Sequence, residues 1–199
     1  MVKTGQTTNL PEAKLLARRE AHMAMAGLSL AQAAEDSQAV CHLILESDAW
    51  QQAAQLLLYI PISGEIDINP LIKKGLEVGK QIALPRFSPE NNGYEACAMP
   101  NLAELVIGKF GIPEPSLGCQ KMDTKQLDLV IVAGVAFDGL GGRLGRGGGF
   151  FDRLLADISA KKCGVCFDQQ VHPDVPVERH DVKMDMIATP SGWLVPQSA

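Results

Sequence analysis

The stretch from Val130 to Leu155, reading VIVAGVAFDGLGGRLGRGGGFFDRLL, constrains the fold more than any other part of the chain. It joins an apolar β-type segment to an amphipathic helix through a connection with seven glycines and two arginines. Glycine lets a backbone approach a ligand closely, and Arg143 and Arg146 can donate paired hydrogen bonds to an anion. The helix expected to begin near Gly149 would add unpaired N–H groups. The stretch therefore predicts a phosphate-binding loop.

Two common phosphate-binding patterns do not fit this loop. A Walker loop needs Gly-Lys followed by Ser or Thr, and no lysine lies between Lys125 and Lys161. The dinucleotide pattern fails because Phe150 stands where its last glycine is required. A phosphate loop of another kind and a flexible surface connection both remain open. An RNA-binding segment of the Arg-Gly-Gly type is a third, weaker interpretation.

Length and composition indicate one domain that spans residues 1–199, in which residues 1–9 are expected to be flexible. The chain has 199 residues, of which 46% are hydrophobic, enough for one sizeable core. Short apolar runs alternate with helical patterns, which predicts an α/β fold, a single three-layer domain with a largely parallel sheet flanked by helices. A net charge of −5 argues against non-specific nucleic-acid binding.

Apolar runs and cysteines indicate the compartment. The longest apolar runs, such as residues 53–60, are far too short for a membrane span, and no signal-peptide pattern is present at the N-terminus. We therefore expect a soluble cytoplasmic protein with no membrane partner, and a monomer. Five scattered cysteines argue against a disulfide framework. Cys163 and Cys166 read as buried strand residues, with redox chemistry as the alternative.

The elements expected along the chain can be named by their ranges. The strands are 55–60, 81–84, 127–133, 163–167 and 184–189, and the helices are one from Pro11, then 29–50, 70–77 and 150–159. In the first helix, Lys14 and Arg18 are four residues apart and share one face, where an anion-binding pair and an ordinary solvated face both remain open. The proline-rich loop 110–115 is rigid enough to form a pocket wall.

Several polar residues are candidates for function because of their place relative to these strands. Glu65 follows the carboxyl end of strand 55–60, where open α/β sheets bind ligands, and Arg86 follows strand 81–84 in the same way. Asp185 lies in an otherwise apolar strand and needs a partner, which could be a cation. His172 and His180 lie near several acids, but their spacing matches no established metal pattern, so a metal site and an irregular loop both remain open.

Taken together, several motifs resemble the 5-formyltetrahydrofolate cyclo-ligases, also called methenyltetrahydrofolate synthetases. The resemblance covers nearly the whole chain and is strongest in GVAFDGLGGRLGRGGGFFDRLL, residues 134–155. It is supported by Lys14 with Arg18 and by YIPISGEID, LPR, GIPEP and VPVERHDVKMDMIATP in the expected order. The resemblance implies ATP-dependent conversion of 5-formyltetrahydrofolate to 5,10-methenyltetrahydrofolate, with release of ADP and phosphate and with Mg²⁺ as cofactor.

The resemblance also implies roles for individual residues. Arg146 would face the transferring phosphoryl group as the catalytic residue, and Asp152 with Asp185 would hold magnesium. Arg153 would be a structural or rim cation. The implied ATP-binding residues are Lys14, Arg18, Arg143, Leu144, Gly145, Arg146, Gly147, Gly148, Gly149, Phe150 and Phe151. The implied residues for the reduced folate are Arg18, Ile60, Glu65 and Phe151.

Two departures from the family pattern bear on activity. Gly148 stands where many members have lysine, and Phe150 and Phe151 stand where tyrosines are usual. The phenylalanines keep an aromatic wall but lose hydroxyl groups. A catalytically weak or silent relative that binds nucleotide or reduced folate is therefore the alternative to an active enzyme.

Overall fold

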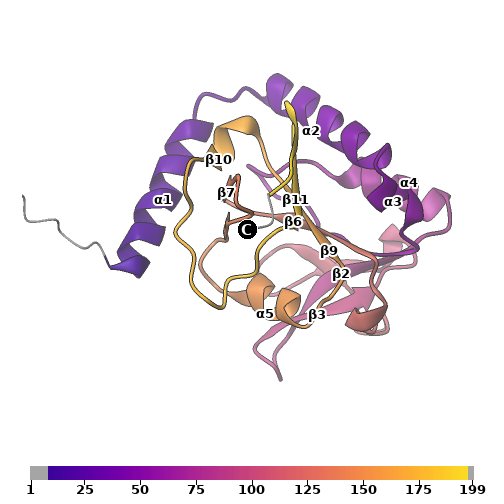
Figure 1. The fold of residues 1–199 in the computed structure, drawn as a ribbon. Helices are drawn as coiled ribbons and strands as arrows, with labels where there is room; N and C mark the ends of the chain where they lie inside the picture. Colours follow the sequence, from indigo (N-terminus) through magenta and orange to yellow (C-terminus); the bar gives the residue numbers. More distant parts are fainter. Residues whose placement is uncertain (1–8, 197–199) are drawn as a thin grey trace, which may run out of the picture.

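A seven-stranded sheet runs through the centre of the computed structural model, which describes residues 9–196 (Figure 1). From one edge to the other its strands are β12 (Gly192–Leu194), β11 (Met186–Thr189), β9 (Lys161–Val165), β6 (Leu129–Ala133), β1 (Gln55–Leu57), β2 (Gln81–Ser88) and β3 (Gly93–Ala98). The five inner strands are parallel to one another, and the two edge strands are antiparallel to their neighbours. The largely parallel sheet expected from the sequence is confirmed. The flexibility expected of residues 1–9 concerns, except for Asn9, residues outside the described part of the chain.

Helices cover both faces of this sheet (Figure 1). One face is covered by α2 (Leu30–Leu45), α3 (Asp48–Gln52) and α4 (Asn69–Glu77), and the other by α5 (Phe150–Ala156). Successive side chains of β6 point to opposite faces, as in any strand. Leu129 and Ile131 accordingly belong to the core under the first three helices, whereas Val130 and Val132 pack with Leu154 of α5. The three-layer arrangement is therefore confirmed, with β6 as its central strand.

The first helix, α1 (Leu10–Met25), packs beside a smaller sheet rather than on the central one (Figure 1). This sheet consists of β10 (Val171–His172), β7 (Ala136–Asp138) and β8 (Arg143–Leu144). The Asn9 side chain caps α1 by accepting a hydrogen bond from the Glu12 amide, 3.2 Å away. Ala21 is the one residue of α1 that is buried, against Ala136, Leu144 and Val175. Because its apolar contact is small, α1 depends on polar contacts for its position.

The remaining elements are short. They are β4 (Leu105–Ile107), β5 (Pro113–Pro115) and the 3-10 turns η1 (Leu102–Glu104), η2 (Thr124–Gln126) and η3 (Asp168–Gln170). Strands β4 and β5 form an antiparallel pair, and β5 also contacts β2. None of the helices between residues 9 and 196 combines the length and the apolar character needed to cross a membrane.

The expectation of one long helix over residues 29–50 is wrong. Ser29 caps α2 as expected, accepting a hydrogen bond from Gln32, but α2 ends at Leu45 and α3 begins at Asp48. Ser47 separates the two helices, because its hydroxyl donates to the Ile44 carbonyl and accepts from the Trp50 amide. A serine that binds the backbone locally competes with the helical ladder in this way.

The expectation that a strand ends before Pro85 is also wrong. Strand β2 continues to Ser88, and Pro85 pairs with Ala96 of β3. Backbone groups of alternate residues point to the same side of a strand, and the Ala83 carbonyl already points toward β1 by accepting from Leu58. The side of Pro85 that lacks an N–H donor therefore faces the space beyond the end of β1, where no strand needs that hydrogen bond. A sheet tolerates proline at such a position.

Candidate active site

The glycine-rich stretch does not lead from strand to helix as one loop. After β6 the chain first makes the β7–β8 hairpin, whose turn is built on the buried carboxylate of Asp138. Its Oδ1 accepts hydrogen bonds from Leu140 and Gly142, both at 2.8 Å, and its Oδ2 accepts from Val175 at 2.9 Å. Sequence reasoning missed Asp138. The part that remains available for a ligand is the segment 145–149, here called the glycine strip.

Two cavities lie on either side of the glycine strip. The polar cavity is lined by Pro11, Lys14, Arg18, Arg143, Leu144, Gly145, Gly147, Gly149, Asp152, Glu178, His180 and Asp181. The apolar cavity is lined mainly by aromatic and aliphatic side chains, among them Tyr59, Ile60, Ile62, Pro85, Tyr94, Phe110, Ile112, Phe150 and Phe151, together with Glu65 and Arg146. Arg143, Gly145, Gly149 and Asp152 line both cavities and so form their common wall.

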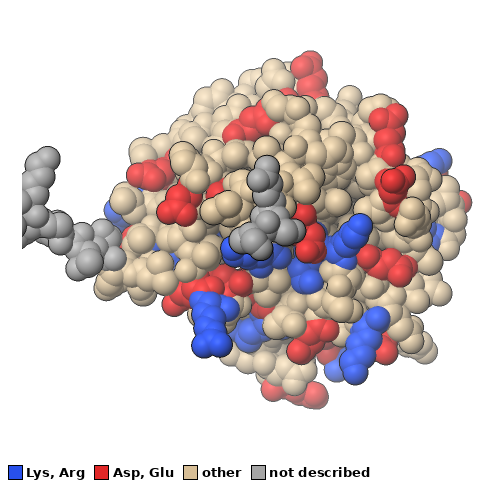
Figure 2. All heavy atoms as spheres, in the orientation of Figure 1, with Lys and Arg blue, Asp and Glu red and all other residues tan. Residues whose placement is uncertain are grey.

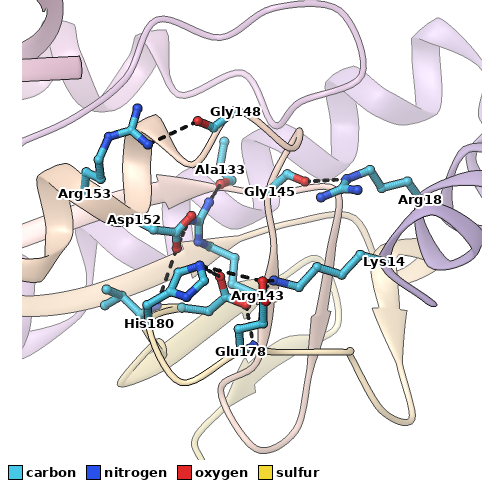
Figure 3. A network of polar contacts seen from close by, with 12 residues as sticks. Lys14, Arg18, Ala133, Arg143, Gly145, Gly148, Asp152, Arg153, Glu178 and His180 are labelled. Atoms are coloured by element: carbon cyan, nitrogen blue, oxygen red, sulfur yellow. Dashed lines mark hydrogen bonds and ion pairs between the residues drawn. The ribbon is translucent and has the colours of Figure 1, made fainter. Parts of the chain in front are cut away.

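Arg143 is the buried centre of this common wall (Figure 3). One end of its guanidinium donates to the Ala133 carbonyl at the end of β6, 3.2 Å away. The other end donates to Oδ1 of Asp152 at 2.7 Å. Oδ1 also accepts from the Val182 amide at 3.4 Å, whereas Oδ2 accepts no hydrogen bond from residues 9–196. The expected phosphate cation Arg143 is thus held as a fixed charge, and Nε of its guanidinium is buried with no partner among the described residues.

Lys14 and Arg18 of α1 both line the polar cavity (Figure 3). Their four-residue spacing predicted a shared helix face, and the family resemblance implied the ATP site. Arg18 donates from Nε to the Gly145 carbonyl at 2.9 Å, so the helix is tied directly to the glycine strip. The ammonium of Lys14 contacts Glu178 at 2.7 Å and Asp181 at 2.5 Å. In the sequence, Asp181 stood out only as one of the acids near His172 and His180, and Glu178 was marked only by the motif VPVERHDVKMDMIATP. The lining of the polar cavity therefore contains both cations and acids, namely Lys14, Arg18, Arg143, Glu178 and Asp181.

Arg146 and Glu65 meet on the apolar cavity. Their side chains form an ion pair of 3.0 Å from Nη2 to Oε1. Glu65 also accepts from the Ile62 amide at 3.1 Å, so it closes a turn in addition to facing the cavity, a structural duty that the sequence did not reveal. Burial raises the pKa of Glu65, and the Ile62 amide and Arg146 lower it only in part, so its pKa stays above the ordinary value. Ile60 lines the same cavity, as expected.

An aromatic cluster forms one wall of the apolar cavity. The Phe150 ring lies 5.8 Å from Phe87, 5.6 Å from Tyr94 and 5.4 Å from Phe110, measured between ring centroids. The Phe151 ring lies 5.9 Å from that of Tyr94. Because Phe110 and its neighbours line the cavity, the expectation that loop 110–115 forms a pocket wall is confirmed. This wall offers aromatic and aliphatic surface to a ligand.

Other predicted cations lie at the edge of this arrangement or outside it. Arg153 lies over Phe150 at 4.9 Å and donates to the Gly148 and Asn92 carbonyls, which fits a rim position. Arg86 does not stand beyond a strand end, because it is inside β2. Its buried guanidinium contacts Glu95 at 2.9 Å and donates to the Ser116 and Cys119 carbonyls, so it holds the chain around β3 together.

Asp152 and Asp185, which the family resemblance joined as metal ligands, are not brought together. Asp185 precedes β11 and accepts from the Lys162 amide at 2.7 Å, at the amino ends of the parallel strands. Asp152 lies in the first turn of α5, next to the carboxyl end of β6. Asp185 lines neither cavity. Asp185 was expected to need a partner, which could be a cation. Its partner is the backbone amide of Lys162.

Histidine and cysteine chemistry does not explain this site. His180 lies near Glu178 and Asp181, and the ligand atoms of the three residues are within 4.8 Å of one another. The ammonium of Lys14 already contacts both of these acids. All five cysteines are buried and unpaired, and burial raises the pKa of Cys163 to about 12. Cys163 and Cys166 are core residues, as expected.

Both the sequence and the fold are similar to those of known proteins. A family model described as the 5-formyltetrahydrofolate cyclo-ligase family matches residues 9–190. A probable 5-formyltetrahydrofolate cyclo-ligase of Caenorhabditis elegans is 32% identical over 164 residues, which cover 76% of this chain and 80% of that protein. The 5-formyltetrahydrofolate cyclo-ligase of Escherichia coli K12 is 33% identical over 151 residues, 70% of this chain and 79% of the relative.

Two solved structures are similar to this protein in fold. The NMR structure of a 5,10-methenyltetrahydrofolate synthetase from Aquifex aeolicus matches with a TM-score of 0.83 and 30% identity, and the match covers 94% of each chain. A 5,10-methenyltetrahydrofolate synthetase from Mycoplasma pneumoniae shares the fold with a TM-score of 0.70 at 18% identity, over 90% of this chain and 99% of the other. The resemblance read from the glycine-rich stretch is confirmed, and the chain belongs to the 5-formyltetrahydrofolate cyclo-ligase family.

Proposed function

We propose that this protein catalyses the ATP-dependent conversion of 5-formyltetrahydrofolate to 5,10-methenyltetrahydrofolate, with release of ADP and phosphate. The observation that carries the proposal is the pair of cavities with a common wall of Arg143, Gly145, Gly149 and Asp152. A reaction that moves a phosphoryl group between two substrates needs two binding spaces that meet at one point. Membership of the 5-formyltetrahydrofolate cyclo-ligase family supports a reduced folate as one substrate, and ATP is proposed as the other.

ATP is assigned to the polar cavity. Its wall carries Lys14 and Arg18, whose remaining N–H groups are suited to phosphate oxygens. Gly145, Gly147 and Gly149 of the glycine strip line the same wall, and they have no side chains to keep a phosphate away from their backbone N–H groups. Gly147 has φ of 102°, and a side chain there would meet the Arg18 guanidinium at 3.5 Å. That distance is ordinary van der Waals contact, so the left-handed backbone explains why glycine stands at this position.

The reduced folate is assigned to the apolar cavity. Phe150, Phe151 and Tyr94 offer aromatic surface to the pterin ring, and Ile60 adds an aliphatic contact. Glu65 offers a carboxylate that can accept hydrogen bonds from pterin N–H groups. The phenylalanines lack the hydroxyl groups usual in the family, but the aromatic wall itself is complete.

The chemistry requires no protein nucleophile. The formyl oxygen attacks the γ-phosphorus of ATP, and the bond from that phosphorus to the oxygen of ADP breaks. The N10 amine then attacks the activated formyl carbon and loses its proton, and phosphate leaves with the former formyl oxygen. The protein positions the formyl oxygen in line and balances the phosphate charge, tasks proposed here for Arg146 and for the fixed charge of Arg143.

A magnesium ion is compatible with the residues at the common wall. Asp152 lines both cavities, and its Oδ2 is not used by any hydrogen bond within residues 9–196. A hard cation that keeps most of its water and binds one carboxylate together with phosphate oxygens fits such a position. When bound, it would neutralise charge on the phosphates. Asp152 alone is proposed as its protein ligand, because Asp185 lies at the other end of the strands.

The test is an absorbance assay with purified protein, 5-formyltetrahydrofolate and MgATP. The methenyl product absorbs in the near ultraviolet, and Arg146→Ala is expected to lose nearly all of the signal. Arg19→Ala is the matched control, because Arg19 is exposed on α1 and lines neither cavity. A folded wild-type protein that binds both substrates without forming product would instead favour the silent relative.

The location and assembly of the protein belong to the same proposal. We infer a cytoplasmic monomer, which cell fractionation and light scattering would test. An RNA-binding role gains no support, because the glycine strip is folded into a cavity wall. Figure 2 shows Lys and Arg side chains interleaved with Asp and Glu on one face of the protein, not a continuous basic surface.

A further inference from the structure

We propose that Tyr94 is a specificity-determining residue, whose hydroxyl donates a hydrogen bond to a carbonyl oxygen of the reduced folate in the apolar cavity. This inference rests on the proposed function, because it needs a reduced folate in that cavity. 5-Formyltetrahydrofolate carries two such oxygens on or next to its ring system, one on the pterin and one on the formyl group. Tyr94 lies in β3 and lines the cavity.

Two tyrosines line the apolar cavity, and their hydroxyls differ in what they already bind. The buried hydroxyl of Tyr59 donates to the Ile66 carbonyl at 2.8 Å. The hydroxyl of Tyr94 forms no hydrogen bond with residues 9–196, and its oxygen is not one of the buried polar atoms that lack a partner. Because the Tyr94 hydroxyl is neither paired nor buried, it is open to a ligand.

Aromatic contacts fix the ring of Tyr94. The other rings of the aromatic cluster surround it edge to face, at centroid distances of 5.6 Å for Phe150, 5.9 Å for Phe151, 6.3 Å for Phe87 and 6.4 Å for Phe110. A tyrosine has only two side-chain torsion angles, so it loses little entropy when it is held in place. The hydroxyl is therefore presented from a rigid position.

Two carboxylates favour the protonated hydroxyl, which is a donor. Burial raises the pKa of Tyr94, and the negative charges of Glu114 and Glu65 raise it further. Tyr94 therefore keeps its proton at neutral pH. Both acids line the same cavity, and an ionised carboxylate only accepts hydrogen bonds. The acids suit the N–H groups of a pterin, whereas a carbonyl oxygen needs a donor such as Tyr94.

Apart from the two tyrosines, the side-chain donors among residues 9–196 that line this cavity are charged and already paired. Arg146 contacts Glu65 at 3.0 Å, and Arg143 is held as a fixed charge by an ion pair of 2.7 Å. In the proposed reaction both arginines serve the phosphoryl group. Tyr94 is therefore the neutral side-chain donor that remains for the folate.

The phenylalanines at positions 150 and 151 make this donor important. Tyrosines, which are usual at both positions in the family, would bring hydroxyls of their own to the aromatic wall. Tyr94 belongs to the same wall and returns one hydroxyl to it. The competing explanation is that Tyr94 contributes only its ring, while its hydroxyl stays in water.

The experiment measures the dissociation constant of 5-formyltetrahydrofolate by calorimetry without ATP, in the wild-type protein and in Tyr94→Phe. The proposal predicts about fivefold weaker binding by the variant, the loss of one neutral hydrogen bond. KM for ATP and the thermal midpoint should not change, because the ring is kept and its hydroxyl has no partner within residues 9–196. A variant that binds the folate as tightly as the wild type overturns the proposal.

Two further variants separate the hydroxyl from the ring. Tyr94→Leu removes both, so it should lower the thermal midpoint and weaken folate binding more than Tyr94→Phe does. Tyr59→Phe removes a hydroxyl that has an internal partner, so it should lower the thermal midpoint by leaving the buried Ile66 carbonyl without its donor. An equal drop in Tyr94→Phe would reveal an internal partner for the Tyr94 hydroxyl and overturn the proposal.

A ligand without the formyl group identifies the oxygen that Tyr94 binds. 5-Methyltetrahydrofolate keeps the pterin carbonyl but has no formyl oxygen. Equal weakening of both ligands by Tyr94→Phe assigns the hydroxyl to the pterin, and weakening of the formyl ligand alone assigns it to the formyl group. A wild-type protein that binds neither ligand would refute the proposed function and this inference together. Equal binding by the wild type and Tyr94→Phe refutes this inference alone.

Discussion

The guanidinium of Arg146 and the carboxylate of Glu65 are paired at 3.0 Å, and both residues line the apolar cavity. The two residues are 81 positions apart in the sequence. Arg146 is 57% exposed on its side chain, and Glu65 only 12%. In the proposed reaction each serves a different substrate, Arg146 the phosphoryl group and Glu65 the pterin. Here the two groups satisfy each other, so the binding of either substrate must compete with this ion pair.

Replacement of Arg146 by Met is expected to raise the pKa of Glu65 further, because Arg146 is one of the groups that lower it. In the proposed binding mode Glu65 accepts hydrogen bonds from pterin N–H groups as a carboxylate, so folate affinity is expected to fall as the pH drops through the pKa of Glu65. The acidic limb of the affinity profile should therefore move to higher pH in the variant. Calorimetric titration of 5-formyltetrahydrofolate without ATP, repeated across mildly acidic pH, measures the shift.

Arg19→Met is the control for that experiment, since it removes the same charge from an exposed position. Arg19→Met should leave the midpoint of the acidic limb of the folate-affinity profile unchanged. An unchanged midpoint in Arg146→Met would mean that the ion pair does not govern the protonation of Glu65.

Gly147→Ala is expected to lower kcat/KM for ATP by about tenfold to a hundredfold. Gly147 has φ of 102°, and an L-residue held in such a conformation costs about 1–3 kcal/mol. The added Cβ would make only an ordinary van der Waals contact with Arg18, so the backbone conformation is the cause of the loss. Steady-state kinetics at varied ATP would show the loss.

Gly139→Ala is the matched control, in the β7–β8 turn of the same stretch. Gly139 has no positive φ, and an added Cβ would meet nothing within 4 Å. This variant should keep wild-type kinetics, with stability equal to or slightly above wild type. Equal losses in both variants would show that glycine content, not the backbone at Gly147, matters.

Much of the fold was predictable because it depends on local patterns. Strand β6 is apolar at every position, and that is what burial under helices on both faces requires. The four-residue spacing of Lys14 and Arg18 placed both on one helix face, and both do line the polar cavity. Such features depend on neighbours in the sequence, so the sequence reveals them.

The parts that could not be predicted depend on contacts between distant residues. The β7–β8 hairpin exists because Asp138 binds backbone amides, including one from Val175, and a lone aspartate gives no sign of this. Asp185 was misplaced because an acid in an apolar strand suggests a cation, whereas the Lys162 amide from the neighbouring strand satisfies it. The contacts of Glu178 and Asp181 with Lys14 could not be predicted because the three residues come from opposite ends of the chain.

Asp152→Asn is expected to raise the magnesium concentration needed for half-maximal activity by about tenfold or more. Asn is neutral and binds hard cations more weakly than a carboxylate. It can still accept the hydrogen bond from Arg143 through its amide oxygen. The buried Arg143 charge would then lack its counter-ion, so a lower thermal midpoint should accompany the change. Activity titrated with magnesium at saturating ATP, together with a thermal melt, measures both effects.

Asp185→Asn is the informative comparison for that experiment. Asp185 accepts from the Lys162 amide and lines neither cavity, so its removal should affect stability without changing the magnesium requirement. A magnesium requirement that rises equally in both variants would restore the pairing of Asp152 and Asp185 implied by the family resemblance.

The ion pair between Lys14 and Asp181 should stabilise the fold within a definite pH window. Burial raises the pKa of Asp181, but the hydrogen bonds from Lys14 and the Glu178 amide outweigh it and leave the pKa below 3.8. Burial lowers the pKa of Lys14, but the hydrogen bonds to Asp181 and Glu178 raise it above 10.5. A lowered carboxyl pKa stabilises the fold above its unfolded value, and a raised ammonium pKa stabilises it below its unfolded value. The contribution is therefore fully present between pH 3.8 and 10.5.

Asp181→Asn is thus expected to lower the free energy of unfolding by about 2 kcal/mol at neutral pH, the size of a hydrogen bond between charged groups. The difference from wild type should shrink as the pH falls through the folded-state pKa of Asp181, because the wild-type carboxyl is then protonated too. Urea unfolding at neutral and at strongly acidic pH measures both values, with Asp174→Asn as the control. A difference that stays constant down to pH 3 or below would show that Asp181 acts through the shape of its turn, since the amide of Asn can still accept the Glu178 hydrogen bond but cannot carry the charge that Lys14 requires.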